Sequence, residues 1–491
     1  MPPIHLTHPE YPFTARLDHL RSTDYPHLDA ADHVYLDYTG AGLASRSQHL
    51  AHEARVSHTL YGNPHSVNPT SAAATHAVEA TRARILAHFN ACPDEYAVVF
   101  TANATGAARL VGESYPFRRA GRLVLTGDNH NSINGLREFA RAGKARTVYV
   151  PVKAPDLRVD GADVVAALPR RKRLRDFLMP GCGAGPEHDG RPGRNGLFAY
   201  PAQSNFSGVR HPLAWVEMAQ GRGYDVLLDA AAYLPTAMLD LSVVKPEFVC
   251  VSWYKLFGYP TGVGCLIAKR EALDRLKRPW FSGGTIQAVS VGAPWHRMVK
   301  GGEAFEDGTL NFQSIPDVHV GLDWLATVGM PVIETRVRCL TGWFLDRLKE
   351  MRHSDGSPMI TIYGPTDLKM RGGTVAFNFL DATGKVVDER LVAFESAAAM
   401  ISLRTGCFCN PGAGESAFNV DPNILRSLPR DEAITLDAFI ARLRLPSAGA
   451  IRVSFGVASN TRDVDKFFGF AEKTYKDRVT TSLGLPFRDS C

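Results

Sequence analysis

Short apolar runs alternate with helical stretches over the first 270 residues of the chain. The runs that we expect to form strands are Tyr96–Phe100, Arg122–Thr126, Thr147–Pro151, Leu197–Tyr200, Asp225–Leu228, Glu247–Val251 and Val263–Ala268. Strands that alternate with helices usually form a mostly parallel sheet with helices on both faces. A helix at about Ser71–Asn90 fits this pattern, because Val78, Ile85, Leu86 and Phe89 share one of its faces. The sequence therefore predicts an α/β fold around a mostly parallel, seven-stranded sheet.

The pattern changes after about residue 310. Helical stretches there precede shorter strand-like runs, at Asp317–Thr327, Ile333–Glu350, Gly373–Phe379 and Ile451–Phe455. We expect an N-terminal arm over residues 1–30, a large domain over residues 31–309 and a smaller α+β domain over residues 310–491. The basic, glycine-rich stretch at about residues 170–196 is predicted to be a mobile insertion in the large domain.

The composition narrows the class of protein. The net charge of +5 is small for 491 residues and is dispersed, which argues against a nucleic-acid or acidic membrane partner. No apolar run has membrane length and the N-terminus has no signal pattern, so we expect a cytoplasmic protein. The eight cysteines are too sparse for a disulfide framework, and Cys250 and Cys265 are predicted to be buried core thiols.

Lys255 lies between a strand-like run and a glycine-rich turn, in the segment SWYKLFGYPTG. A lysine that forms a Schiff base is held at the end of a rigid strand and is partly desolvated, so that its amine can be neutral. It also needs a phosphate site nearby if the aldehyde is pyridoxal 5'-phosphate (PLP). The alternative interpretation is an ordinary strand-end lysine that faces water.

A phosphate site is predicted where the segment TANATGA, residues 101–107, opens a helix. Small residues such as Ala104 let backbone N–H groups approach an anion at a helix N-terminus, and Thr105 adds a hydroxyl. Ser252 and Tyr254 would complete the site from the other side. Small residues also make ordinary strand-to-helix turns, which is the alternative.

Three further residues follow strand-like runs and could contact a PLP ring. Asp229 could keep the pyridine nitrogen protonated, although aspartate in this position also caps helices. His130 could stack on the ring, although a histidine at a strand end is often structural. Asn205 could donate to the phenolic oxygen, although asparagine is also common in turns.

The segment RTGCFCNPG, residues 404–412, carries two thiols two residues apart beside an arginine. An exposed thiol near an arginine is suited to act as a nucleophile. One alternative is half of a metal site, but the sequence has no second Cys/His pair at zinc spacing, so we expect no metal. The other alternative is a pair of inert loop cysteines. If the segment is extended, Cys407 and Cys409 point to opposite sides and only one faces a cofactor.

These motifs resemble those of the cysteine desulfurases, which are PLP enzymes of class V and fold type I. The resemblance is strongest to the N-terminal, desulfurase-like domain of the molybdenum cofactor sulfurases, and it covers about residues 30–460. It rests on the segments YLDYTGAG, YPAQSNFSG, YKLFGYPTG and RTGCFCNPG, which begin at Tyr35, Tyr200, Tyr254 and Arg404.

The resemblance implies a role for each candidate residue. Lys255 is implied to be the Schiff-base lysine, and Asp229, His130 and Asn205 to contact the ring. The residues implied to hold the phosphate are Ala104, Thr105, Ser252 and Tyr254. Thr285 is implied to reach the phosphate of the partner subunit, which predicts a homodimer.

The resemblance also implies the substrate and the product. Arg452, assisted by Arg404, is implied to bind the carboxylate of L-cysteine, and Cys409 to accept its sulfur as a persulfide while alanine leaves. The sulfur then passes to a separate acceptor, because the molybdenum-cofactor-binding domain of the full-length sulfurases has no counterpart in these residues. The roles of Cys407 and Cys491 stay open.

Two positions depart from the family patterns. Ordinary desulfurases have a glutamine where this chain has Ala232, a position that tends to be small in the sulfurases. The sulfurases usually have a further cysteine where this chain has Gly414. The alternatives are a PLP-dependent C–S lyase, a selenocysteine lyase or an amino-acid epimerase of the same fold, perhaps in secondary metabolism, and a non-catalytic scaffold.

Overall fold

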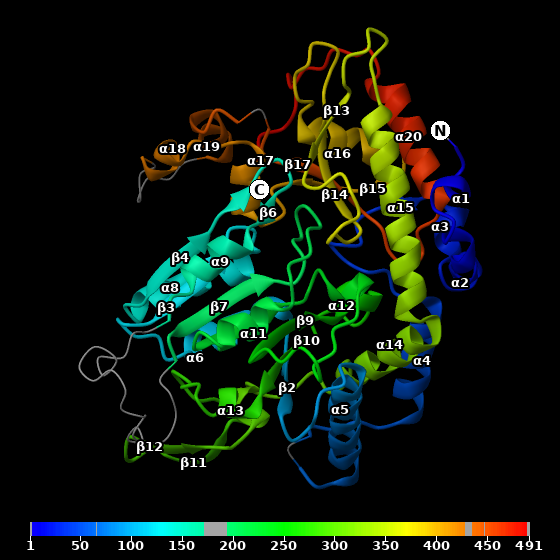
Figure 1. The fold of residues 1–491 in the computed structure, drawn as a ribbon. Helices are drawn as coiled ribbons and strands as arrows, with labels where there is room; N and C mark the ends of the chain where they lie inside the picture. Colours follow the sequence, from blue (N-terminus) through cyan, green and yellow to red (C-terminus); the bar gives the residue numbers. More distant parts are fainter. Residues whose placement is uncertain (1, 65, 171–193, 428–434, 446, 489–491) are drawn as a thin grey trace.

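The computed structural model describes residues 2–64, 66–170, 194–427, 435–445 and 447–488 (Figure 1). The seven strands predicted in the first 270 residues all form and join one sheet, in the order β2-β10-β9-β8-β7-β3-β4. Their bounds are β2 Tyr96–Thr101, β3 Arg122–Thr126, β4 Arg146–Val150, β7 Gly196–Pro201, β8 Tyr224–Asp229, β9 Phe248–Ser252 and β10 Gly264–Lys269. Only β10 is antiparallel to its neighbours, so the prediction of a mostly parallel, seven-stranded sheet is confirmed.

Six of the seven strands are buried on both faces, and the edge strand β4 is partly exposed. Along β8, Val226 and Leu228 join one apolar cluster and Leu227 joins the other. Helices α5 (Pro69–His88) and α11 (Trp215–Gln220) contribute to the first cluster, whereas α6 (Ala104–Ser114) and α8 (Leu136–Ala142) contribute to the second (Figure 1). Helices therefore cover both faces, as a parallel sheet requires. Cys250 and Cys265 are fully buried in these strands, which confirms them as core thiols.

The strand directions bring the predicted site residues to one edge of the sheet. Strands β2, β9, β8, β7 and β3 all run the same way, because β10 reverses direction between β2 and β9. The loops that follow these five strands therefore meet at their shared carboxyl edge. Ligands of open α/β sheets bind at this edge.

A second sheet has four antiparallel strands in the order β13-β14-β17-β16. Their bounds are β13 Ile360–Tyr363, β14 Thr374–Phe379, β16 Arg404–Gly406 and β17 Ala450–Ser454. The long helix α15 (Met330–Glu350) packs against this sheet and against α20 (Thr461–Tyr475). Figure 1 shows the blue N-terminal helices beside α15, and Arg336 of α15 forms an ion pair with Asp18.

Some predictions about organisation stay untested. The domain boundaries at residues 30 and 309 remain predictions. Most of the predicted insertion at residues 170–196 lies outside the described residues, as do Cys182 and Cys491. Among the described residues, no helix combines the length and the apolar character needed to cross a membrane.

Candidate active site

A cavity of about 160 Å³ lies at the carboxyl edge of the seven-stranded sheet. It is lined by all the residues predicted to contact the cofactor within one subunit: Ala104, Thr105, His130, Asn205, Asp229, Ser252, Tyr254 and Lys255. These residues lie at or just after the ends of five different strands, which explains how segments 150 positions apart, such as Thr105 and Lys255, share one site. Asn103, Ser132 and Gln203 also line the cavity and were not predicted.

Lys255 is held on a short, rigid helix. The chain leaves β9 and forms α12 (Trp253–Phe257), whose buried rings Trp253 and Phe257 stack with centroids 6.0 Å apart. Gly258 ends this helix with a φ of 78°, a conformation that glycine adopts readily. The backbone of Gly42 packs so closely that an added Cβ would lie 2.9 Å from the Gly258 nitrogen. The amine of Lys255 therefore starts from a fixed backbone.

The surroundings of Lys255 favour its neutral form. Burial lowers the pKa of the amine below its ordinary value of 10.5. The carboxylate of Asp229 partly offsets this effect, while the positive charges of Arg452 and Arg404 lower the pKa further. A partly desolvated amine beside cationic groups can act as a nucleophile or a base near neutral pH.

The predicted phosphate site is built from hydroxyls and a helix N-terminus. Asn103 caps α6 by accepting a hydrogen bond from the Gly106 amide, at 2.9 Å. The Ala104 amide donates to Ser252 Oγ at 3.3 Å, and the hydroxyls of Thr105 and Ser132 lie 2.7 Å apart. Backbone N–H groups and hydroxyls in this arrangement suit an anion, because the helix dipole adds positive potential.

Asp229 and His130 present complementary groups to the cavity. Asp229 Oδ1 accepts from the Ala231 amide at 3.0 Å, and no described residue donates to Oδ2. The carboxylate therefore both caps the turn and keeps one oxygen for a cationic ligand. His130 Nδ1 accepts from the Ser132 amide at 3.1 Å. Burial and the charge of Lys255 lower the pKa of His130, so its imidazole is neutral at pH 7.

The two predicted carboxylate-binding arginines meet at Asp37. Arg452 is 3% exposed; its Nη2 donates to Asp37 Oδ1 at 2.9 Å and its Nη1 donates to the Asn205 carbonyl at 3.0 Å. Arg404 Nη2 donates to Asp37 Oδ2 at 2.6 Å. The Nε of Arg452 is buried and has no hydrogen-bond partner among the described residues. The guanidinium of Arg452 lies over the Phe408 ring, 4.7 Å from its centroid, and Arg452 is not among the residues that line the cavity.

The thiol segment forms a turn rather than an extended strand. The Asn410 amide donates to the Cys407 carbonyl at 3.0 Å, and Phe408 and Cys409 have φ values of 56° and 53°. Cys407 and Cys409 were expected to face opposite sides only if the segment was extended, and it is not. Phe408 is buried against Phe206, with ring centroids 5.3 Å apart, whereas Cys409 is exposed.

Backbone contacts place the Cys409 turn beside the cavity. The Cys409 carbonyl accepts from the Asn131 amide at 2.7 Å, directly after His130. Gly412 packs on Gly127, because an added Cβ would lie 2.1 Å from the Gly127 carbonyl oxygen. Cys409 itself is not among the residues that line the cavity. Cys409 is exposed, and its backbone is bonded to the loop that follows β3.

The family model for aminotransferase class-V matches residues 34–171 and 192–467. The chain belongs to the class-V aminotransferase family. It is 34% identical to the molybdenum cofactor sulfurases of Oryza sativa over 478 residues and of Homo sapiens over 476 residues, which cover 94% and 92% of this chain. It spans about half the length of these relatives, 58% and 51% respectively.

Solved structures of cysteine desulfurases share the fold of this class-V protein. The apo cysteine desulfurase of Thermococcus onnurineus superposes with a TM-score of 0.72 at 22% identity, covering 93% of this chain and 97% of that one. The cysteine desulfurase CsdA of Escherichia coli superposes with a TM-score of 0.69 at 21% identity, covering 93% and 98%. The predicted resemblance and the PLP fold type I architecture are confirmed.

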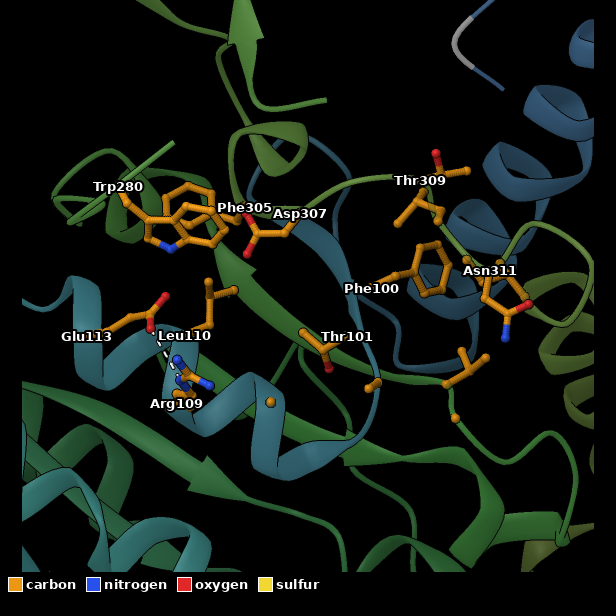
Figure 2. Close-up of a pocket in the computed structure, with 16 residues that line it drawn as sticks. Phe100, Thr101, Arg109, Leu110, Glu113, Trp280, Phe305, Asp307, Thr309 and Asn311 are labelled. Carbon is orange, nitrogen blue, oxygen red and sulfur yellow. Dashed lines mark ion pairs between the residues drawn. The ribbon is translucent and has the colours of Figure 1, made fainter. Parts of the chain in front are cut away.

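Thr285 is the one predicted cofactor contact of this class-V chain that the structure places away from the cavity. Its hydroxyl bonds to the Ser282 amide and carbonyl, each at 2.9 Å, just before the hairpin of β11 (Ile286–Ser290) and β12 (Trp295–Met298). A second cavity, of about 400 Å³, lies on the outer face of α6, and Figure 2 shows Trp280 and Phe305 above the Arg109–Glu113 ion pair. None of the predicted site residues lines it.

Several residues of the site escaped sequence reasoning. Asp37 lies in the segment YLDYTGAG, but the chain gives no sign that it binds arginines 367 and 415 positions away. Gln203 donates to the Ala232 carbonyl at 2.9 Å and lines the cavity. Asn410 belongs to the thiol motif, but its residue type alone does not predict its contacts with Asp128 and Asn205. All three residues lie within the family-like motifs, so membership of a motif was the one available sign that they belong to the site.

Proposed function

We propose that this class-V protein is a PLP-dependent cysteine desulfurase of molybdenum cofactor sulfurase type. It converts L-cysteine to L-alanine and holds the sulfur as a persulfide on Cys409. The observation that carries the proposal is the juxtaposition of two groups. Lys255 is a partly buried amine in a cavity with a free carboxylate oxygen, and an exposed thiol turn is hydrogen-bonded to the rim of that cavity.

The residues of the cavity fit PLP. Asp229 offers a carboxylate oxygen to the pyridine nitrogen, and His130 offers a neutral ring for stacking. Asn205 would contact the phenolic oxygen. The phosphate would be held by Ala104, Thr105, Ser252 and Tyr254. When bound, PLP supplies an electron sink for negative charge at the substrate α-carbon.

The chain's own residues bind the substrate and move its proton. Arg452 and Arg404 bind the carboxylate of L-cysteine, which must share these arginines with Asp37. The lowered pKa of Lys255 keeps part of its amine neutral, so Nζ can take the α-proton and return a proton later. Because Arg452 is buried, water is excluded from its ion pair with the substrate carboxylate, which strengthens that pair.

Cys409 accepts the sulfur. The Cβ–Sγ bond of L-cysteine breaks and an S–S bond forms on Cys409, while the thiol proton released in this step balances the proton added to Cβ of alanine. The bond exchange needs no outside oxidant or reductant. The exposed position of Cys409 suits later transfer of the terminal sulfur to a separate acceptor.

We also propose a homodimer in the cytoplasm. Exposed apolar side chains gather on and near the β11–β12 hairpin, namely Trp280, Phe281, Val289, Val291 and Trp295. Such a patch is typical of an interaction surface. Thr285 lies directly before this hairpin; its side chain is fully buried and bonded to Ser282, so its hydroxyl must turn outward to reach the phosphate of the partner subunit's cofactor.

The test is a single turnover of the PLP-loaded protein with L-cysteine, in which alanine, pyruvate, sulfide and protein-bound persulfide are all measured. We expect alanine and persulfide in equal amounts. Cys409→Ser should keep the PLP absorbance and lose persulfide and sulfide, while the neighbouring Cys407→Ser serves as the control. Pyruvate in place of alanine would contradict the proposal and identify a C–S lyase.

A further inference from the structure

The side chain of Asn410 connects the Cys409 turn with the cavity. It is fully buried, and both of its N–H groups are used: Nδ2 donates to the Asp128 carbonyl at 2.7 Å and to Asn205 Oδ1 at 2.9 Å. Its Oδ1 accepts from the Ala413 amide at 3.2 Å. The turn that carries Cys409 is thereby bonded to the loops after β3 and β7.

These bonds fix which way each amide points. The carbonyls of Asp128 and Phe408 can only accept, and the Ala413 amide can only donate. Asn410 must therefore present its NH₂ group to Asn205. Asn205 must in turn present Oδ1 to Asn410 and Nδ2 to the Phe408 carbonyl, at 2.8 Å. Backbone groups at both ends leave one orientation for the pair of amides.

This orientation leaves one N–H group of Asn205 for a ligand. Asn205 lines the cavity, and the Phe408 carbonyl is the one acceptor that the described residues provide to its Nδ2. An amide rotated by half a turn would present an oxygen instead and would repel an anionic acceptor. The backbone carbonyl of Asn205 also accepts from Arg452, so the same residue touches the predicted carboxylate site.

We propose that Asn410 is a positioning residue that sets the Asn205 amide and the Cys409 turn together. Through Asn205 it turns an N–H group toward an oxygen acceptor of the ligand in the cavity. Through its bonds to Asp128 and Asn205 it holds the thiol beside the same ligand. The identity of that ligand as PLP rests on the proposed function, whereas the coupling between the turn and the cavity does not.

The coupling can be tested without cofactor by hydrogen exchange and mass spectrometry. In Asn410→Ala we expect faster exchange in the peptide that contains the thiol turn. The amide of Asn131 should also exchange faster, because it donates to the Cys409 carbonyl. Asn423→Ala is the matched control. It truncates an exposed asparagine whose side chain accepts one hydrogen bond among the described residues, from Arg426 at 3.3 Å, and both peptides should exchange as in the wild type.

The second arm uses the PLP-loaded protein. Asn410→Ala and Asn205→Ala should each keep bound PLP and each lower sulfide release from L-cysteine by about 10²-fold, the typical cost of a displaced reacting group. Both substitutions remove the hydrogen bond between Asn410 and Asn205. The double variant should therefore lose no more sulfide release than either single variant. A pure loss of stability would not produce this equality at temperatures where all variants are folded.

Each outcome decides the inference. Wild-type exchange at Asn131 in folded Asn410→Ala, or losses that multiply in the double variant, would overturn it. If Asn410→Ala does not fold, Asn205→Ala must give the same faster exchange of the thiol turn, since it removes the bond to the Phe408 carbonyl. A wild-type protein that binds no PLP would overturn the proposed function, and the exchange experiment would still decide the role of Asn410.

Discussion

The Lys255 turn and the Cys409 turn both follow strands, but they are held in different ways. Lys255 follows β9, an interior strand of the seven-stranded sheet, and two stacked aromatic rings and the close approach of Gly42 fix its backbone. Cys409 follows β16, an edge strand of the four-stranded sheet. One buried ring, Phe408, and a few side-chain amides hold its turn.

The two turns differ in how firmly they are held, and this difference suits the different roles of Lys255 and Cys409. A lysine that binds a cofactor works best on a rigid support, because small displacements of reacting groups are costly. A thiol that collects sulfur and then gives it to a partner needs a support that can be released. Substitution of Lys255 should therefore abolish all chemistry, whereas substitution of Cys409 itself should affect sulfur transfer alone.

The largest effect is expected for Lys255→Ala. Loss of the amine that moves the α-proton should lower alanine formation by about 10⁴-fold. Lys269→Ala is the matched control, since Lys269 ends a strand of the same sheet and pairs with Glu247 at 3.5 Å. Alanine formation is measured by chromatography. Near-normal turnover in Lys255→Ala would remove the lysine from the mechanism.

A smaller effect is expected at the carboxylate site. Arg452→Met should raise the KM for L-cysteine by about 10- to 100-fold, the typical worth of a hydrogen bond to a charged group. Arg404→Met should raise it less, because the side chain of Arg404 is 50% exposed and that of Arg452 is 3% exposed. Equal effects on KM, or a larger effect for Arg404→Met, would contradict this order.

The pH dependence of PLP binding tests the environment of Lys255. Its lowered pKa means that the amine loses its proton below pH 10.5, so the rate of PLP addition to the apo-protein should reach half its maximum below that pH. Asp229 raises this pKa, so Asp229→Asn should move the midpoint to lower pH. Stopped-flow absorbance gives the midpoint; an upward shift in Asp229→Asn would contradict the electrostatic account.

The smallest effect is expected from Gly412→Ala. The added methyl would meet the Gly127 carbonyl, so the Cys409 turn must shift, at a cost of about 1–3 kcal/mol. Gly414→Ala is the control, because an added Cβ at Gly414 would lie 4.0 Å from the nearest atoms, in the rings of Phe206 and Phe418. Thermal unfolding measures the cost, and PLP binding should stay normal in both variants. Lost PLP binding in Gly412→Ala would show that the two turns are not separable.

The sequence predicted the cavity better than it predicted the thiol turn. Ser252, Asp229 and Asn205 follow recognisable strands, and parallel strands bring their carboxyl ends together by geometry alone. The turn at Cys407–Asn410 depends on positive φ values at Phe408 and Cys409, which non-glycine residues seldom adopt and which their identity does not reveal. The contact between Asp37 and Arg404 joins residues 367 positions apart, and residue types alone do not pair them.

The most direct test of the central claim is mass spectrometry of the PLP-loaded protein after it reacts with L-cysteine. The account predicts one additional sulfur atom on Cys409, located by fragment ions within the peptide that also contains Cys407. The same addition should persist in Cys407→Ser and vanish in Cys409→Ser, while α-proton exchange continues in both. Wild-type sulfide release by Cys409→Ser, with no persulfide on any cysteine, would contradict the account.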